Sequence, residues 1–194
     1  MTETRVLVER IRDAVDRAER AGLVLPNAMT LATVRADGQP SARLVLLKSI
    51  DEDGLVFYTN LGSRKATDLA HEPRAALCFW WGALEEQIRV EGSVSPVSDA
   101  EADAYFATRL RGSQLGAWAS RQSEPLASRE ALVDAFRRYE FEFEGQSVPR
   151  PPFWSGYRLA PARIEFWRGR KDRLHERVEY VRESNGWREQ LLQP

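Results

Sequence analysis

The chain has 194 residues, of which 43% are apolar and 29% charged, and its formal net charge is −1. These values fit one compact domain with a sizeable core, and the near-neutral charge argues against bulk binding of nucleic acid. One cysteine and two histidines exclude an intrachain disulfide and disfavour a structural zinc site, so we expect no metal. Because no apolar stretch is long enough to span a membrane and the first residues lack a signal-peptide core, we expect a cytoplasmic protein.

The first predicted element is an amphipathic surface helix. Over residues 4–21, apolar residues from Val8 to Ala18 recur at helical spacing among many charged residues. Gly22 is placed to end this helix. We therefore assign residues 1–22 to an N-terminal amphipathic helix.

The periodicity then changes to that of strands. Strands are predicted at 29–34, 43–47, 55–59, 75–81, 86–94, 157–168 and 173–181. Asp37-Gly38 and Asp53-Gly54 are turn sequences between the first three strands, which predicts an antiparallel meander. Helices are predicted at 64–71, 98–109 and 128–143. Many strands, few helices and no repeated βα alternation predict a mainly β fold, a closed or partly closed antiparallel barrel with peripheral helices.

The start of the predicted helix 64–71 carries an unfavourable arrangement of charges. Ser63 is a suitable N-cap, but Arg64 and Lys65 place two cations in the first turn, where the helix dipole disfavours them. A bound phosphate would reverse that penalty through helix N–H groups and charge-assisted hydrogen bonds. Two solvated surface cations are the alternative interpretation.

A second basic cluster lies on the predicted helix 98–109. Tyr105 and Arg109 are one turn apart on one helix face, and Ser113 lies just beyond. Such a pair is also common on solvated helix surfaces. Lys48 closes the strand that contains Arg43, and because their separation is odd, both serve one site only if the strand bends or ends before Lys48.

The third basic cluster is the run Arg173-Leu174-His175-Glu176-Arg177, in which every second residue is basic. If the run is a strand, its period of two places the three basic side chains on one face. They would repel one another there unless the face is solvated or holds an anion. This face is a candidate binding site.

Several segments together resemble the pyridoxamine 5′-phosphate oxidase family. These segments are 43–48, 57–65, 113–123, 164–170 and 173–177. They follow the family's order and spacing from about residue 26 almost to the C-terminus. The resemblance implies the FMN-binding split β-barrel, as a single domain over 1–194 in which the C-terminal strands 153–194 complete the active site.

The resemblance also implies roles for individual residues. FMN would be held by Arg43, Lys48, Tyr58, Thr59, Arg64, Lys65, Gln87, Gln122, Ser123, Trp167 and Arg177. The phosphate of the substrate would be held by Lys48, Tyr105, Arg109 and Ser113. Arg173 and His175 would be the catalytic pair and would lie over the substrate ring. The FMN site would lie between the two subunits of a homodimer.

The activity that the resemblance implies is the oxidation of pyridoxamine 5′-phosphate and pyridoxine 5′-phosphate to pyridoxal 5′-phosphate. Oxygen would accept the electrons and give H2O2, in vitamin B6 biosynthesis or salvage. One alternative is a related FMN oxidase acting on another substrate, such as a dihydrophenazine, and the complete phosphate-binding set argues against it. The other is a split-barrel protein that binds flavin or pyridoxal phosphate without turnover. It is motivated by Leu25, which replaces a usual acidic residue, and by the lack of the family's N-terminal closing segment.

Overall fold

The computed structural model describes residues 3–194 of the chain. The predicted first helix is present as α1 (Glu3–Arg20), although residues 1–2 of the assigned segment 1–22 lie outside the described residues. Its apolar face buries residues such as Leu7 and Ile11 against the sheet. The helix ends where Gly22 adopts a positive φ of 75°, a conformation that glycine adopts without steric cost.

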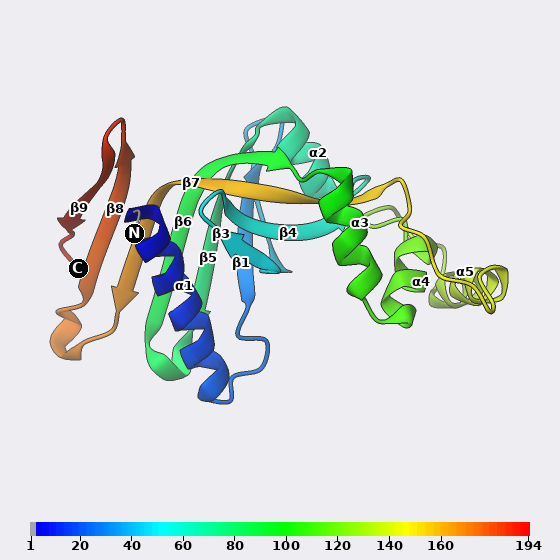
Figure 1. Cartoon of the computed structure of the whole chain (residues 1–194), viewed down its shortest axis with the longest axis horizontal. Coiled ribbons are helices and arrows are strands. Elements are labelled where there is room, and N and C mark those ends of the chain that lie inside the picture. The colour runs from blue at the N-terminus through cyan, green and yellow to red at the C-terminus, as the bar shows by residue number, and fades with distance from the viewer. Residues whose placement is uncertain (1–2) are drawn as a thin grey trace.

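One antiparallel sheet contains the nine strands of the described residues (Figure 1). They are β1 (Ala28–Val34), β2 (Pro40–Leu46), β3 (Ser49–Asp51), β4 (Gly54–Asn60), β5 (Arg74–Trp81), β6 (Glu86–Pro96), β7 (Trp154–Arg168), β8 (Glu176–Glu183) and β9 (Gly186–Leu191). The strand order is β2-β1-β5-β6-β7-β4-β3, while β8 pairs with β7 and β9. The C-terminal hairpin β8–β9 therefore extends the sheet at one end, away from β2.

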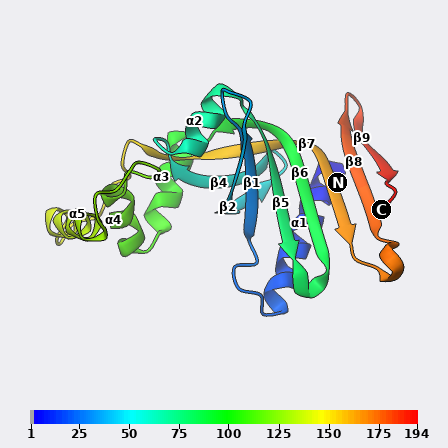
Figure 2. The same ribbon diagram turned by 180° about the vertical axis from the view of Figure 1, so that it is seen from behind.

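Strand β7 pairs with three other strands and so connects the parts of the sheet. Its first residues pair with β4 and its last with β8, while β6 runs along most of its length. A register shift in β6 falls between Glu91 and Gly92, and a Cβ at Gly92 would clash with the carbonyl oxygen of Ala160. Glycine here lets the two strands approach closely at the bulge. The sheet curls into a partly closed barrel, which Figures 1 and 2 show from two sides.

The predicted meander is wrong. The Asp37-Gly38 turn joins β1 to β2 as expected, but the Asp53-Gly54 turn joins β4 to the short strand β3. Strand β1 instead takes β5 as its second neighbour. The strands β3 and β9 were not predicted. Strand β3 has three residues, too few to show a period, and β9 is mostly polar, so its alternation of polar and apolar residues is weak.

The helices match the predictions more closely. Besides α1 they are α2 (Arg64–His71), α3 (Asp99–Thr108), α4 (Arg111–Ala119) and α5 (Arg129–Glu142), with short 3-10 turns at η1 (Gly82–Leu84) and η2 (Lys171–Arg173). Only α4 was not predicted, because Gly112 and Gly116 lower its helix propensity. Helices α3 to α5 lie at the end of the molecule opposite β8 and β9 (Figure 1).

Two apolar clusters support the functional regions. The main core packs α1 and the inner sheet face around Ile11, Leu31 and Phe57. A smaller cluster joins α3, α4 and the start of β7 around Phe106 and Trp154. The prediction of a mainly β fold with a partly closed antiparallel barrel and peripheral helices is confirmed. None of the helices within residues 3–194 has the length and apolar character needed to cross a membrane.

Candidate active site

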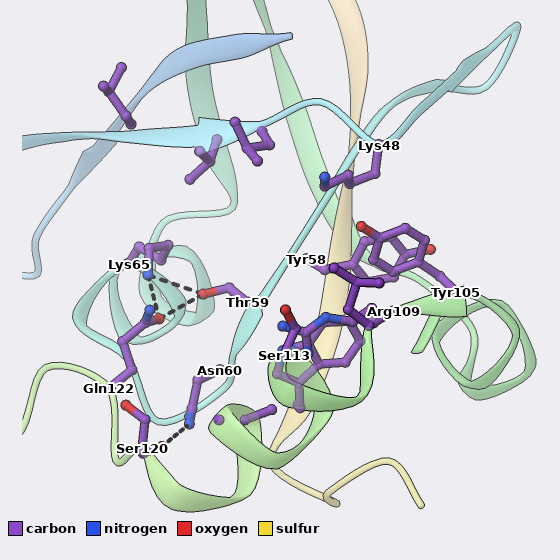
Figure 3. Close-up of a pocket in the computed structure, with 17 residues that line it drawn as sticks. Lys48, Tyr58, Thr59, Asn60, Lys65, Tyr105, Arg109, Ser113, Ser120 and Gln122 are labelled. Atoms are coloured by element: carbon purple, nitrogen blue, oxygen red, sulfur yellow. Dashed lines mark hydrogen bonds between the residues drawn. The ribbon is translucent and has the colours of Figure 1, made fainter. Parts of the chain in front are cut away.

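A cavity of about 640 Å³ lies between β2, β4, the start of α2, and helices α3 and α4 (Figure 3). The predicted site residues that line it are Lys48, Tyr58, Thr59, Lys65, Tyr105, Arg109, Ser113 and Gln122. They divide into a group around Lys65 and a group around Arg109 (Figure 3). Two of the basic clusters noted in the sequence therefore face one cavity.

Lys65 forms the centre of the first group. It lies in the first turn of α2 and is only 8% exposed. Its Nζ donates to Thr59 Oγ1 at 3.0 Å, Ser63 Oγ at 3.2 Å and Gln122 Oε1 at 2.8 Å. Burial, and secondarily the charge of Arg43, lower the pKa of Lys65 to about 8. A buried ammonium surrounded by neutral oxygens favours an anion beside it.

Arg64 and Ser123 lie next to this group but, unlike Lys65, do not line the cavity. Arg64 is exposed and does not line the cavity, although its backbone N–H donates to Ser123 Oγ at 3.2 Å. This bond ties the start of α2 to the segment after α4. Ser123 has a positive φ of 76° and itself lies outside the cavity lining.

Arg43 does not line the cavity either. Its guanidinium donates to Thr33 Oγ1 at 2.6 Å and to Ser41 Oγ at 2.5 Å, and it lies 3.4 Å from the buried carboxylate of Asp68. Strand β2 ends at Leu46, so Lys48 lies beyond the strand and reaches the cavity. The condition that the strand must end before Lys48 is met, but only Lys48 contributes a cavity side chain.

An aromatic stack lies within the group around Arg109. The ring of Tyr58 lies 4.1 Å from that of Tyr105 and 5.3 Å from that of Trp154, nearly parallel to both. A Cβ at Gly156 would stand 2.7 Å from the Tyr58 ring, so glycine there makes room for the stack. Burial raises the pKa of Tyr58 to about 12, so its hydroxyl stays neutral near pH 7.

Arg109 forms the centre of the second group. Its guanidinium carbon lies 4.7 Å from the centre of the Trp154 ring, and Nη1 is buried without a hydrogen-bond partner among the described residues. Burial lowers the pKa of Arg109, since few charges compensate it there. An unpaired buried guanidinium nitrogen is costly unless a ligand accepts its hydrogen bond. With Lys48 and the hydroxyls of Tyr105 and Ser113 nearby, this end suits a phosphate dianion.

Among the polar and aromatic residues that line the cavity, Asn60, Ser120 and Trp154 were not predicted. Asn60 Nδ2 donates to the carbonyl oxygen of Ser120 at 3.1 Å, while its Oδ1 accepts from the N–H of Gly62 at 2.8 Å. These bonds join the end of β4 to the end of α4 and hold two cavity walls together. The Trp154 ring stacks on that of Tyr58 and lines the cavity. The sequence offered one signal for Asn60, a polar residue directly after an apolar strand and before a helix N-cap.

The remaining predicted residues lie elsewhere in the chain. Gln87 and Trp167 are register partners on β6 and β7, and Arg177 on β8 donates to Glu165 Oε1 at 2.7 Å. The ring of His175 lies 4.7 Å from that of Trp167. Arg173 lies in the turn just before β8, so these residues belong to the β8 end of the sheet, opposite helices α3 and α4 (Figure 1).

The predicted strand 173–181 begins later than expected. Strand β8 starts at Glu176, and Arg173 belongs to the turn η2 with a positive φ of 61°. The idea that Arg173, His175 and Arg177 share one strand face is therefore wrong. The left-handed backbone at Asp172 and Arg173 breaks the period of two before the strand begins.

Comparisons with known proteins point to one family. The family model described as pyridoxamine 5′-phosphate oxidase matches residues 15–143, and the model described as pyridoxine 5′-phosphate oxidase C-terminal dimerisation region matches residues 154–194. A Rubrobacter xylanophilus protein named pyridoxine/pyridoxamine 5′-phosphate oxidase is 62% identical over 92% of this chain and 82% of its own length. A protein of the same name from Myxococcus xanthus is 56% identical over 96% of this chain and 91% of its own.

Two solved structures are similar along nearly the whole chain. PhzG from Burkholderia lata 383, in complex with tetrahydrophenazine-1-carboxylic acid, has 34% identity and a TM-score of 0.91 over 96% of this chain and 92% of its own. A pyridoxamine 5′-phosphate oxidase-related, FMN binding protein from Nostoc punctiforme has 22% identity and a TM-score of 0.76 over 96% of each chain, a likeness of fold alone. The two family models cover most of the sequence, and the first relatives exceed half identity, so the chain belongs to the pyridoxamine 5′-phosphate oxidase family.

Proposed function

We propose that the chain is an FMN-dependent oxidase that converts pyridoxamine 5′-phosphate and pyridoxine 5′-phosphate to pyridoxal 5′-phosphate. The observation that carries the proposal is the cavity with two separate cationic groups, one of which leaves Arg109 Nη1 buried without a partner. Two phosphate-bearing molecules, the cofactor and the substrate, account for two such groups. The names of the close relatives support the same activity.

The first group fits the phosphate of FMN. Lys65 would hold it from the first turn of α2, with Arg64 reaching in from the exposed side and Thr59 adding a hydroxyl. Gln122 and Ser123 would close the same end after α4. When bound, FMN would supply the redox chemistry, accepting a hydride from C4′ of the substrate and passing the electrons to oxygen to give H2O2.

The second group fits the phosphate of the substrate. Arg109 would donate through Nη1, Lys48 would add a second charge, and the hydroxyls of Tyr105 and Ser113 would complete the set. Held at this end, the substrate would place its ring toward the middle of the cavity. Fixing the phosphate in this way orients the ring for reaction and lowers the entropic cost of the encounter.

The residues at the β8 end would serve the cavity of a second subunit. Gln87, Trp167 and Arg177 lie on the outer sheet face, as does Leu44 of the cavity wall, which is 72% exposed. A two-fold dimer that packs these outer faces together would bring the β8 end of one chain to the β2 end of the other. The match of residues 154–194 to a dimerisation region supports a homodimer.

The same arrangement would assign Arg173 and His175 to the ring of the substrate bound in the partner's cavity. There they would orient the ring and balance charge as the hydride leaves. The chain would then be one domain over 1–194, in which 153–194 completes the active site of the other subunit. Arg43, tied to Thr33 and Ser41, would support the FMN phosphate from behind Lys65.

The second candidate is oxidation of another substrate, which the similarity to PhzG favours. A tricyclic acid without a phosphate would leave part of the cationic set around Arg109 unpaired. Storage of flavin or pyridoxal phosphate without turnover is the third candidate. It would need the cavity but not the catalytic pair Arg173 and His175.

One assay separates the three candidates. The purified protein is examined for flavin absorbance, and pyridoxine 5′-phosphate is added under air while aldehyde and peroxide are followed. Formation of both products supports the oxidase. Preferential turnover of a dihydrophenazine acid would favour the second candidate, and a yellow protein without product from either would favour storage.

Two sets of variants test the division of roles. Arg173→Ala and His175→Ala should keep flavin but lose substrate affinity or turnover, since neither lies at the phosphate of the cofactor. Arg64→Ala should weaken FMN binding itself. Loss of flavin from Arg173→Ala, measured by absorbance after gel filtration, would refute this assignment.

A further inference from the structure

The turn between β7 and β8 has a demanding backbone shape. It carries Arg173 and His175, and both Asp172 and Arg173 adopt left-handed conformations, with φ of 57° and 61°. Two successive non-glycine residues in this region are unfavourable unless their surroundings hold them. Within the turn a backbone bond runs from Leu174 N–H to the carbonyl oxygen of Lys171, at 3.1 Å. Contacts at the ends of the turn can hold this shape in addition.

An ion pair joins those ends. Arg170 Nε lies 2.8 Å from Glu176 Oε1, and Arg170 Nη2 lies 2.7 Å from Glu176 Oε2. Two parallel bonds fix the orientation of the partners as well as their distance. The charge of Arg168 also attracts Glu176, but Arg168 itself is paired with Glu86. The pair between Arg170 and Glu176 thus closes a loop that contains only residues 171–175.

The same arrangement sets the orientation of His175. The backbone N–H of Arg170 donates to His175 Nδ1 at 3.2 Å, and the imidazole lies 4.7 Å from the centre of the Trp167 ring. A nitrogen that accepts a hydrogen bond from a backbone amide carries no proton, so the ring proton lies on Nε2. His175 is therefore presented as an Nε2–H donor.

We infer that Arg170 and Glu176 form a positioning clamp that holds Arg173 and His175 in the arrangement in which they meet the substrate. Neither clamp residue touches the reacting atoms; both act through the turn. The inference rests on the proposed function, because it takes Arg173 and His175 to be the residues that face the substrate ring. It adds two positioning residues that belong to no other part of the proposed site.

A spectroscopic test needs no turnover. The chain has two histidines, so ¹⁵N spectra of the holoprotein should show one signal set for His175 and one for His71 on α2. We expect the Nε2–H tautomer for His175 in the wild type. In Arg170→Ala the His175 signals should move to the average of two tautomers, while those of His71 stay unchanged. Unchanged His175 signals in the variant would overturn the inference.

A kinetic test uses a double-mutant cycle. Arg170→Ala and Glu176→Gln should each raise KM for pyridoxine 5′-phosphate about 3- to 5-fold at unchanged flavin content, the size expected of an exposed ion pair. The double variant should lose no more than either single one, because both remove the same interaction. Additive losses would show that the two residues act separately, against the clamp.

The neighbouring hairpin provides a matched control. Arg188 and Glu183 form an ion pair between β9 and β8 with side chains 48% and 52% exposed, close to the 42% and 58% of Arg170 and Glu176. Arg188→Ala should leave KM and the His175 signals unchanged; an equal effect would mean that any lost surface pair suffices. If the wild type fails to oxidise the substrate, the proposed function fails while the spectra still decide whether the clamp orders His175.

Discussion

The predicted site has two halves, the cavity and the β8 end of the sheet, which differ in how their cations are neutralised. In the cavity, burial lowers the pKa of Lys65 and of Arg109, and Arg109 Nη1 has no partner among the described residues. At the β8 end, the hydrogen bond with Glu165 raises the pKa of Arg177, and Arg170 is paired with Glu176. The cavity therefore has positive charge to offer to anions, whereas Arg170 and Arg177 at the sheet end are already paired within their own chain.

The two halves also differ in rigidity and exposure. Lys65 and Thr59 are buried and mutually bonded, whereas Arg173 is exposed on a turn. A site that binds phosphates tightly benefits from groups fixed before the ligand arrives. Groups that act on the substrate of a second subunit must instead lie on an accessible surface. Under the proposed function, this difference fits phosphate-binding groups inside one chain and ring-facing groups on its surface.

The largest expected effect concerns the unpaired guanidinium. Arg109→Ala should raise KM for pyridoxine 5′-phosphate about 10- to 100-fold, since it removes charge-assisted hydrogen bonds to the phosphate. Flavin content should stay unchanged, because FMN would bind at the other group. Steady-state kinetics and flavin absorbance measure both quantities. Arg129→Ala, an exposed arginine at the start of α5, is the control and should behave as wild type.

A mixing experiment tests whether the two halves come from different subunits. Arg109→Ala and Arg173→Ala homodimers should each be nearly inactive at low substrate concentration. After the subunits are unfolded together and refolded in equal amounts, about one quarter of the wild-type sites should be intact, because half the dimers are mixed and each has one complete site. Activity that stays at the level of the separate variants would mean that each chain completes its own site.

The lowered pKa of Lys65 predicts a smaller, pH-dependent effect. Only the protonated ammonium attracts a phosphate, so FMN affinity should be full below about pH 8 and fall as the pH rises through that value. A fall of about 10-fold is expected over the next unit or two. Fluorescence titrations of the apoprotein measure it. Lys65→Arg keeps its charge over this range and should abolish the fall; persistence of the fall would assign it to another group.

The smallest expected effect concerns Trp80. Its half-exposed ring lies edge-on to Trp167, with the ring centres 5.9 Å apart, so it supports a proposed flavin residue without lining the cavity. Trp80→Ala should weaken FMN binding about 2- to 5-fold at unchanged dimer content, as expected for one aromatic pair. Phe141→Ala, an exposed aromatic on α5, should have no effect. Equal losses in both variants would contradict a role for Trp80.

Local signals predicted most of the secondary structure. The N-cap Ser63 and the charged turn after it placed α2 at its observed bounds. The predicted start of α3 is also close to that observed, where the N-cap Ser98 accepts from the N–H of Glu101. Predictions failed where local patterns were weak or overruled. Strand β3 is too short to show a period, and the run from Arg173 to Arg177 alternates like a strand although its first half is a turn.

The sequence by itself determined most of the elements, the family resemblance and the chemical types of the site residues, because these depend on periodicity, capping and motif order along the chain. Only the tertiary structure decided how the site residues divide. Lys65, Gln122 and Arg109 meet in one cavity because β4, α2 and α4 fold against each other, while β7 carries Trp167 to the far end of the sheet. The physical reason is that burial and the pairing of charges depend on contacts between distant segments, which no local pattern contains.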